Sequence, residues 1–167
     1  MVPFDRASIF LHDPDKDVLR ISVLESSAAA HILPIGTEVS ATDSHAGWVF
    51  QHNEPLVRHD LVDSLRFPVE ERVLAAGFRS YVMLPLVARG KSLGTLGVAS
   101  VEPYPYGETD VSFLREVATQ IAMAVENMSA YAKIGALNAR MTEAAERARM
   151  AMREQLTRHL PRRNATA

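Results

Sequence analysis

The chain has 167 residues, of which 47% are hydrophobic and 23% charged, so its size and composition suit one globular domain with an appendage. It contains no cysteine, which excludes disulfides, thiolate metal sites, thiol catalysis and a thioether-linked chromophore. No apolar run is long enough to span a bilayer, and no signal peptide opens the chain, so we expect a cytoplasmic protein.

The net charge of −2 conceals a difference between the two ends of the chain. Residues 1–132 hold 10 Lys and Arg against 17 Asp and Glu, whereas residues 133–167 hold 8 against 3. Such a change is typical of a boundary between a folded unit and an interaction segment. We therefore expect a domain over residues 1–132, an amphipathic signalling or coiled-coil helix over 133–160, and a disordered tail over 161–167.

The first half of the chain predicts a hairpin followed by two short helices with a brief strand between them. Asn53 and Gly77 follow the two helices and suit their ends. Asp13, Asp15 and Asp17 alternate as in a calcium loop, but the glycine and glutamate of such a loop are missing, which favours a polar hairpin turn. The expected elements are strands at residues 7–11, 18–24 and 56–58 and helices at 45–52 and 68–76.

The block at residues 77–100 predicts a second hairpin. Two short apolar runs, expected as strands at 81–87 and 93–101, meet at a glycine-containing joint. The glycines at 94 and 97 lie inside a strand, where they favour close backbone packing over phosphate binding. A long helix beginning near Thr109 supplies the covering layer that a strand pair needs.

The long helix continues beyond what a covering layer requires. Its apolar residues recur at steps of three and four past Gly135, and Pro161 is expected to end it. Ala and Met at these positions make a weak heptad-like seam. The seam favours a homodimer formed through this helix.

The order of these elements, and two sets of residues within them, resemble a GAF domain. The first set resembles the family's G-W-x…G-E-P-L…D stretch, with Asn53 in place of the usual glycine, and the second resembles its G-x-R-S…P-L…G…G-x-L signature. The residues are Gly47, Trp48, Val49, Glu54, Pro55, Leu56 and Asp60 in the first set, and Gly77, Phe78, Arg79, Ser80, Leu84, Pro85, Leu86, Gly90, Gly94, Thr95, Leu96, Gly97 and Val98 in the second. The resemblance covers residues 4 to about 130.

The resemblance implies an α+β fold, with a GAF-like antiparallel sheet of about five or six strands flanked by helices and a long C-terminal helix. GAF domains usually begin with a helix ahead of the first strand, whereas here that strand begins almost at Met1. The first helix is therefore expected to be absent or truncated, or its covering layer to come from another subunit.

A ligand is expected between the sheet and the segment at residues 25–80. Arg79 is the strongest polar candidate, because a guanidinium beside an apolar pocket suits an anionic ligand. Pairing of Arg79 with Asp60 or Glu71 is the alternative, and core packing is the simpler interpretation of each apolar candidate. The candidate ligand-binding residues are Trp48, Phe67, Phe78, Arg79, Tyr81, Met83 and Thr95.

The family resemblance leaves several functions to choose from. GAF domains include cyclic-nucleotide receptors, bilin photoreceptors, haem sensors and a sulfoxide reductase. The absence of cysteine excludes bilin attachment and reductase chemistry, and the absence of the N-K-x-F-D-E-type motif argues against cyclic-nucleotide binding without excluding it. No catalytic constellation or metal-ligand spacing emerges, and the six histidines are expected at the surface or hydrogen-bonded, with an axial haem ligand as the alternative.

We therefore expect a non-catalytic sensory domain of a signal-transduction protein, and not an enzyme. It would bind a small molecule, dimerise, or both, and relay a signal through its C-terminal helix. The alternatives are a ligand-free GAF dimerisation module and a cyclic-nucleotide- or haem-binding sensor. The sequence indicates no particular cofactor.

The basic residues of the last helix also have three interpretations. Nucleic-acid binding is disfavoured because no aromatic residues lie between the basic ones. Membrane-surface binding is disfavoured because the helix has no large apolar residues opposite its charges. A two-helix signalling coil needs only the seam and a charged exterior. Residues 153–161 resemble the linker that precedes class III nucleotide cyclase domains. We expect as partners a small molecule, a second copy of the chain and an output domain such as a nucleotide cyclase, a kinase or a transcriptional activator, with no nucleic acid and no membrane.

Overall fold

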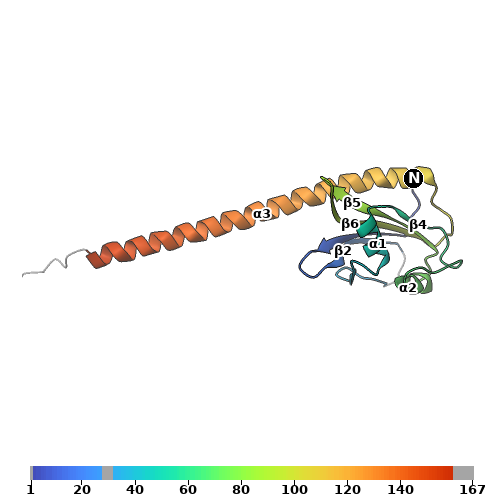
Figure 1. Ribbon diagram of the computed structural model, residues 1–167, viewed down its shortest axis with the longest axis horizontal. Coiled ribbons are helices and arrows are strands. Elements are labelled where there is room, and N and C mark those ends of the chain that lie inside the picture. The colour runs from blue at the N-terminus through green and yellow to red at the C-terminus, as the bar shows by residue number, and fades with distance from the viewer. Residues whose placement is uncertain (1, 28–31, 160–167) are drawn as a thin grey trace, which may run out of the picture. The chain divides into compact units, whose positions relative to one another are not determined.

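The computed structural model describes residues 2–27 and 32–159 (Figure 1). The chain divides between Glu126 and Asn127 into two compact units, of which the first holds a six-stranded antiparallel sheet in the order β3-β2-β1-β6-β5-β4. The strands are β1 (Arg6–Asp13), β2 (Val18–Ser26), β3 (Glu38–Ser40), β4 (Leu56–Arg58), β5 (Ser80–Ala88) and β6 (Lys91–Ser100), and the helices are α1 (His45–His52), α2 (Val69–Ala75) and α3 (Glu108–His159). The expected α+β fold is confirmed.

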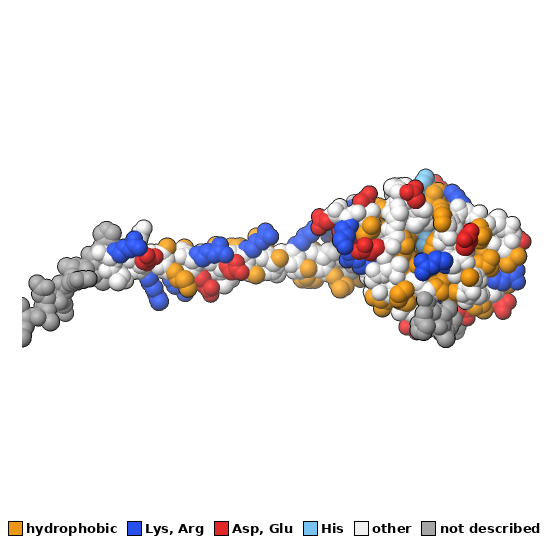
Figure 2. Space-filling model, turned by 90° about the horizontal axis from the view of Figure 1, so that it is seen from below, with side chains coloured by type: hydrophobic (Ala, Val, Ile, Leu, Met, Phe, Trp, Pro, Cys, Tyr) orange, Lys and Arg blue, Asp and Glu red, His pale blue; other side chains and the backbone are white. Residues whose placement is uncertain are grey.

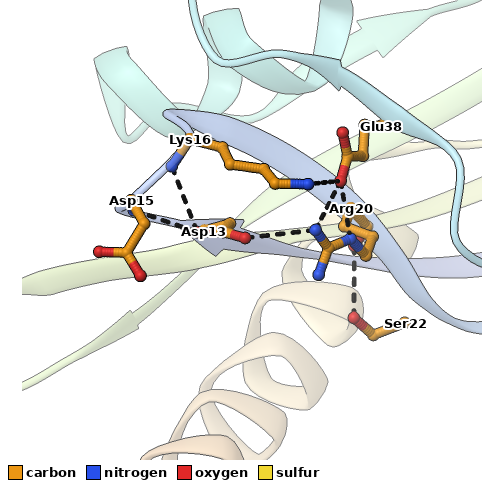
Figure 3. Close-up of polar contacts among 6 residues, drawn as sticks. All are labelled: Asp13, Asp15, Lys16, Arg20, Ser22 and Glu38. Carbon is orange, nitrogen blue, oxygen red and sulfur yellow. Dashed lines mark hydrogen bonds and ion pairs between the residues drawn. The ribbon is translucent and has the colours of Figure 1, made fainter.

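The short edge strand β3 was not expected from the sequence. It pairs with β2 over only three residues, too few to show an alternating pattern. Side chains hold it in place: Arg20 of β2 bonds Glu38 of β3 on one side and Asp13 of β1, at 3.2 Å, on the other (Figure 3). Lys16 adds a second contact to Glu38, at 3.3 Å.

Asp13 also stabilises the turn between β1 and β2. The Oδ1 atom of Asp13 accepts hydrogen bonds from the backbone N–H groups of Asp15 and Lys16 (Figure 3). Asp17 adopts a left-handed backbone at φ 52°. In the part of the chain that the structure describes, no group of three or more His, Asp or Glu side chains could hold a metal ion. Asp13 pairs with Val18 across the turn between the antiparallel strands β1 and β2, so the predicted polar hairpin turn is confirmed.

The sheet separates two hydrophobic cores. One lies between the sheet and the α1 and α2 helices, and the other between the sheet and the first turns of α3 (Figure 1). Because successive residues of a strand point to opposite faces, Tyr81 and Met83 of β5 belong to the first core and Val82 and Leu84 to the second. Each face of β5 thus meets a different helical layer.

Gly94 allows β1 and β6 to pair closely at the centre of the sheet. It lies opposite Leu11 in the register, and a Cβ atom at this position would stand 1.9 Å from the carbonyl oxygen of Phe10. No side chain fits there, so this glycine serves backbone packing.

The described part of the second unit is the continuation of α3 beyond Glu126. Every side chain from 127 to 158 is exposed, including Tyr131, Ile134 and Leu137. Figure 2 shows hydrophobic patches interspersed with charged groups along it, and two i,i+4 ion pairs, Glu143 with Arg147 and Glu154 with Arg158, lie on its surface. No helix in residues 2–27 or 32–159 is both long and apolar enough to cross a membrane. The proposed tail at 161–167 lies outside the described residues.

Candidate functional site

A small cavity lies within the first unit, on the α1 and α2 side of the sheet. The space open to the centres of water molecules is about 40 Å³, enough for roughly three waters. Most of its wall is apolar and comes from Phe10, Leu33, Val73, Phe78, Met83 and Ala99. The polar groups on its wall belong to Arg6, Ser8, His45 and Tyr81.

Strand β1 brings Arg6 into this cavity by simple alternation. Arg6, Ser8 and Phe10 are the buried positions of the strand's first half. Arg6 is only 6% exposed, and its Nη2 atom donates a hydrogen bond of 2.7 Å to the carbonyl oxygen of Leu33. Its Nη1 atom has no hydrogen-bond partner among the described residues. Burial lowers the pKa of this guanidinium, but arginine remains protonated in proteins.

The start of α1 brings His45 to the cavity. The Ser44 hydroxyl accepts the N–H of Gly47 at 2.9 Å and fixes the first turn, so that His45 points inward. The imidazole is 4% exposed and lies edge-on to the rings of Phe10 and Tyr81, with centroids 5.8 and 5.7 Å away. Its Nδ1 atom has no hydrogen-bond partner in the described residues. The expectation of a surface or hydrogen-bonded histidine is therefore wrong here.

Burial also decides the charge of His45. Desolvation lowers the pKa of the imidazole to about 4, with Arg6 acting in the same direction and Glu70 opposing it. At neutral pH the ring is therefore neutral and offers one N–H donor and one acceptor.

Behind the cavity wall, Tyr81 is bonded to the buried carboxylate of Glu70. The tyrosine hydroxyl donates to Glu70 Oε1 at 2.7 Å, and Arg58 Nε donates to the same atom at 2.9 Å. Backbone N–H groups of Arg66 and Phe67 donate to the other oxygen. Burial alone would raise the pKa of Glu70, but these hydrogen bonds outweigh it and lower the pKa. Glu70 is thus held as a carboxylate by hydrogen bonds from Tyr81, Arg58 and two backbone N–H groups.

Three of the residues predicted to bind a ligand meet at the cavity. Phe78, Tyr81 and Met83 all line it. Thr95 is fully buried in β6 but is not part of the wall, and its hydroxyl has no hydrogen-bond partner among the described residues.

Trp48 and Phe67 lie away from the cavity wall, at the partly exposed edge of the same core. The Arg66 guanidinium lies over both rings, 4.7 Å from the Trp48 centroid and 5.1 Å from that of Phe67, and His52 stacks on Trp48. These contacts account for both aromatic side chains without a ligand.

Arg79 is also outside the cavity wall. It forms a two-point ion pair with Asp60, the first of the two partners considered from the sequence, and its side chain is 40% exposed. Sequence reasoning therefore selected one arginine and missed another, Arg6. Arg6 shares its strand face with Phe10, but the predicted strand began at residue 7 and left Arg6 out.

A second hollow lies on the α3 face of the sheet. It is an open groove of about 440 Å³, lined by apolar side chains of β1, β2, β6 and α3, and the described residues leave it uncovered. Phe4, Val23 and Phe113 on its wall are each about half exposed.

The profile of the GAF domain matches residues 1–126, so the chain belongs to the GAF domain family. The structure is similar to the GAF domain of a two-component sensor histidine kinase from Bacillus halodurans, with 22% identity, a TM-score of 0.68, and coverage of 78% of this chain and 87% of that one. It is also similar to the GAF domain of a phosphoenolpyruvate-protein phosphotransferase from Coxiella burnetii, with 16% identity, a TM-score of 0.66, and coverage of 77% and 75%.

An enzyme has the same fold. Free methionine-R-sulfoxide reductase from Neisseria meningitidis, solved with its substrate, is 19% identical, with a TM-score of 0.61 and coverage of 74% of this chain and 68% of that one. At such identities these likenesses show the fold alone. A search of curated proteins finds no match.

Proposed function

We propose that this chain is a non-catalytic sensory domain, which binds a small molecule in the cavity beside Tyr81 and Met83 and relays its presence to α3. One observation carries the proposal: the strands that line the cavity are the strands on which α3 packs. Val98 of β6 lines both the cavity and the groove beside α3, and Met83 and Leu84, adjacent in β5, face the two sides.

This arrangement gives a ligand a direct route to the helix. An occupant that moves Tyr81 or Met83 moves the β5 backbone, and with it Leu84, which packs in the same core as Leu114 and Ala118 of α3. Packed cores transmit small displacements because they contain few voids. A ligand would shift the population of helix arrangements by as much as its affinity for them differs.

The exposed part of α3 supports a homodimer as the second element of the relay. A helix whose apolar residues all face water gains stability by burying them against a second helix. The continuation of α3 from the first unit into the second would carry a change in the sheet toward an output domain, such as a cyclase, a kinase or a transcriptional activator. GAF domains of a sensor kinase and a phosphotransferase share this fold.

The polar groups of the cavity support binding more than catalysis. Ser8 and His45 both line it, but no hydrogen bond joins them among the described residues. Glu70 is the acidic residue whose charge acts on His45, and its carboxylate accepts hydrogen bonds from Arg58 and Tyr81 instead. A nucleophile needs a base within hydrogen-bond reach. The cavity therefore offers hydrogen-bond donors to a ligand, but its described residues include no nucleophile hydrogen-bonded to a base.

The size of the cavity favours a small ligand over the two larger alternatives, a cyclic nucleotide and haem. Sites for drug-sized ligands measure roughly 300–1,000 Å³, so a cyclic nucleotide or haem would need the wall to open. His45 is the one histidine on the cavity wall among the described residues, and is the residue that haem would require as its axial ligand. Absence of a Soret band after haem reconstitution would exclude that alternative.

The test is a thermal-shift screen of small metabolites, nucleotides and haem against the wild-type chain and Ala99→Leu. Ala99 lines the cavity, so a leucine there fills the space a ligand would use. We expect at least one compound to raise the Tm of the wild type and to lose its effect in Ala99→Leu, while Val101→Leu, an exposed control, keeps it. A screen in which nothing raises the Tm would favour the ligand-free dimerisation module.

A further inference from the structure

We propose that the ligand of this cavity is a short-chain monocarboxylate, bound through the guanidinium of Arg6. The inference rests on the proposed function, because it names the chemical class recognised at the same site. It is carried by one unusual feature of the cavity wall, a buried positive charge without a negative partner.

Within the described residues, the Arg6 guanidinium has no acidic partner. No Asp or Glu of the described residues lies within 4.0 Å of its guanidinium, whereas the partly buried Arg58 is paired with Glu70. The residues outside the description, 1, 28–31 and 160–167, include no Asp or Glu. A buried charge is costly unless it is paired. An anionic occupant would supply the missing partner.

The other polar groups at the cavity do not neutralise Arg6. Glu70 acts on His45 through its charge, but its oxygens are occupied by Tyr81, Arg58 and backbone donors, and it is not part of the wall. His45 is neutral, and its unpartnered Nδ1 atom can carry the ring proton in one tautomer. The wall therefore presents one cation, Arg6, and the neutral donors of His45 and Ser8, and its described residues include no carboxylate.

The rest of the wall sets the size and polarity of the ligand. Room for roughly three waters suits a molecule of a few heavy atoms. Phe10, Phe78 and Met83 surround that space with apolar surface, which favours a hydrocarbon body over a second charged group. A planar carboxylate also matches the fork of donors on a guanidinium. Acetate, propionate and isobutyrate meet these conditions, whereas inorganic phosphate supplies the charge without the apolar body.

The first experiment compares each acid with its own amide. Acetate, propionate and isobutyrate are titrated against the full chain at constant ionic strength, beside acetamide, propionamide, isobutyramide and inorganic phosphate, with Tm as the readout. We expect at least one carboxylate to raise the Tm, with its amide and phosphate giving no comparable shift. Equal effects of acid and amide, or a larger effect of phosphate, would overturn the proposal.

Variants then test the role of Arg6. Arg6→Met removes the charge and is expected to weaken carboxylate binding about tenfold or more, and Arg6→Lys is expected to restore part of it. Arg79→Met is the matched control, because Arg79 lies outside the cavity wall and is paired with Asp60. Carboxylate binding that persists in Arg6→Met would contradict the proposal.

A measurement on the wild type keeps the proposal testable if Arg6→Met fails to fold. The side-chain ¹H–¹⁵N resonance of Arg6 is followed during a propionate titration, with propionamide as the control. We expect a saturable shift with propionate alone, and no shift at saturating propionate would refute the role of Arg6. If a neutral compound stabilises the wild type but not Ala99→Leu, the carboxylate proposal fails while the proposed function stands. If no compound stabilises the wild type, both the carboxylate proposal and the proposed function fail.

Discussion

The Tyr81 hydroxyl donates a 2.7 Å hydrogen bond to the carboxylate of Glu70, and both side chains are buried. The bond joins β5, at the wall of the cavity, to α2, which lies over the same core. Since the ring of Tyr81 also meets His45 edge-on, a change at the cavity wall reaches the helix layer through one side chain. The stability of the site therefore depends on Glu70.

Glu70→Gln is expected to destabilise the chain by about 3 kcal/mol. The substitution leaves the partly buried Arg58 without its counter-charge, and it replaces one of the two carboxylate oxygens that accept from Tyr81, Arg58, Arg66 and Phe67 by an NH₂ group. The measurement is chemical denaturation at neutral pH. Glu71→Gln, one residue along and exposed, is the control and is expected to change stability by less than about 0.5 kcal/mol. Equal effects of the two variants would contradict the account.

The buried His45 predicts a loss of stability in mild acid. Its pKa is about 4 in the folded chain and about 6.5 when unfolded, so between these values the unfolded chain binds one proton more. Unfolding free energy therefore rises with pH through this window, and about 2 kcal/mol of it should disappear between pH 6.5 and pH 5.

The variant His45→Gln should lose this part of the pH dependence, measured by denaturation at both pH values. His52→Gln, at the exposed end of the same helix, should keep it. An unchanged pH dependence in His45→Gln would show that another group is responsible.

Gly94→Ala is expected to destabilise the sheet by several kcal/mol or to prevent folding, because the added Cβ would collide with backbone and not with a movable side chain. Gly135→Ala is the matched control. A Cβ there meets nothing within 4 Å, and alanine is the better helix former by about 1 kcal/mol. Far-UV circular dichroism during thermal unfolding distinguishes them. A tolerant Gly94→Ala would mean that β1 and β6 pair less closely than described.

Leu137→Lys tests dimerisation through α3. A lysine in the apolar seam should convert the chain toward monomer in sedimentation equilibrium at micromolar concentration. Ala139→Lys carries the same added charge about 200° around the helix and should leave the association unchanged. A wild-type chain that sediments as a monomer, unchanged by deletion of residues 133–167, would rule out the dimer.

The sequence predicted the architecture well because its signals are local. The hairpin at 77–100, the caps of α1 and the long run of α3 each depend on patterns within a few residues. The edge strand β3 escaped because three residues show no period, and Arg20 holds it from another strand.

The site was harder to predict because contacts between residues far apart in the sequence decide which charged side chains are buried. Arg79 and Arg6 are equally plausible in the sequence. Only the position of β1 between β2 and β6 buries Arg6, while Asp60 keeps Arg79 near the surface. The helix at 45–52 was predicted from the sequence, but the direction in which its first turn points His45 depends on the sheet beneath α1.

The most direct test of the central claim, that occupancy of the cavity is relayed to α3, is a distance between the two helices of a dimer. The chain has no cysteine, so Ala139→Cys carries a single spin label per protomer. Double electron–electron resonance is recorded without ligand and with the compound that raises the Tm most, at saturation. The account predicts a shifted distance distribution, which Ala99→Leu abolishes. An unchanged distribution with the cavity occupied would contradict it.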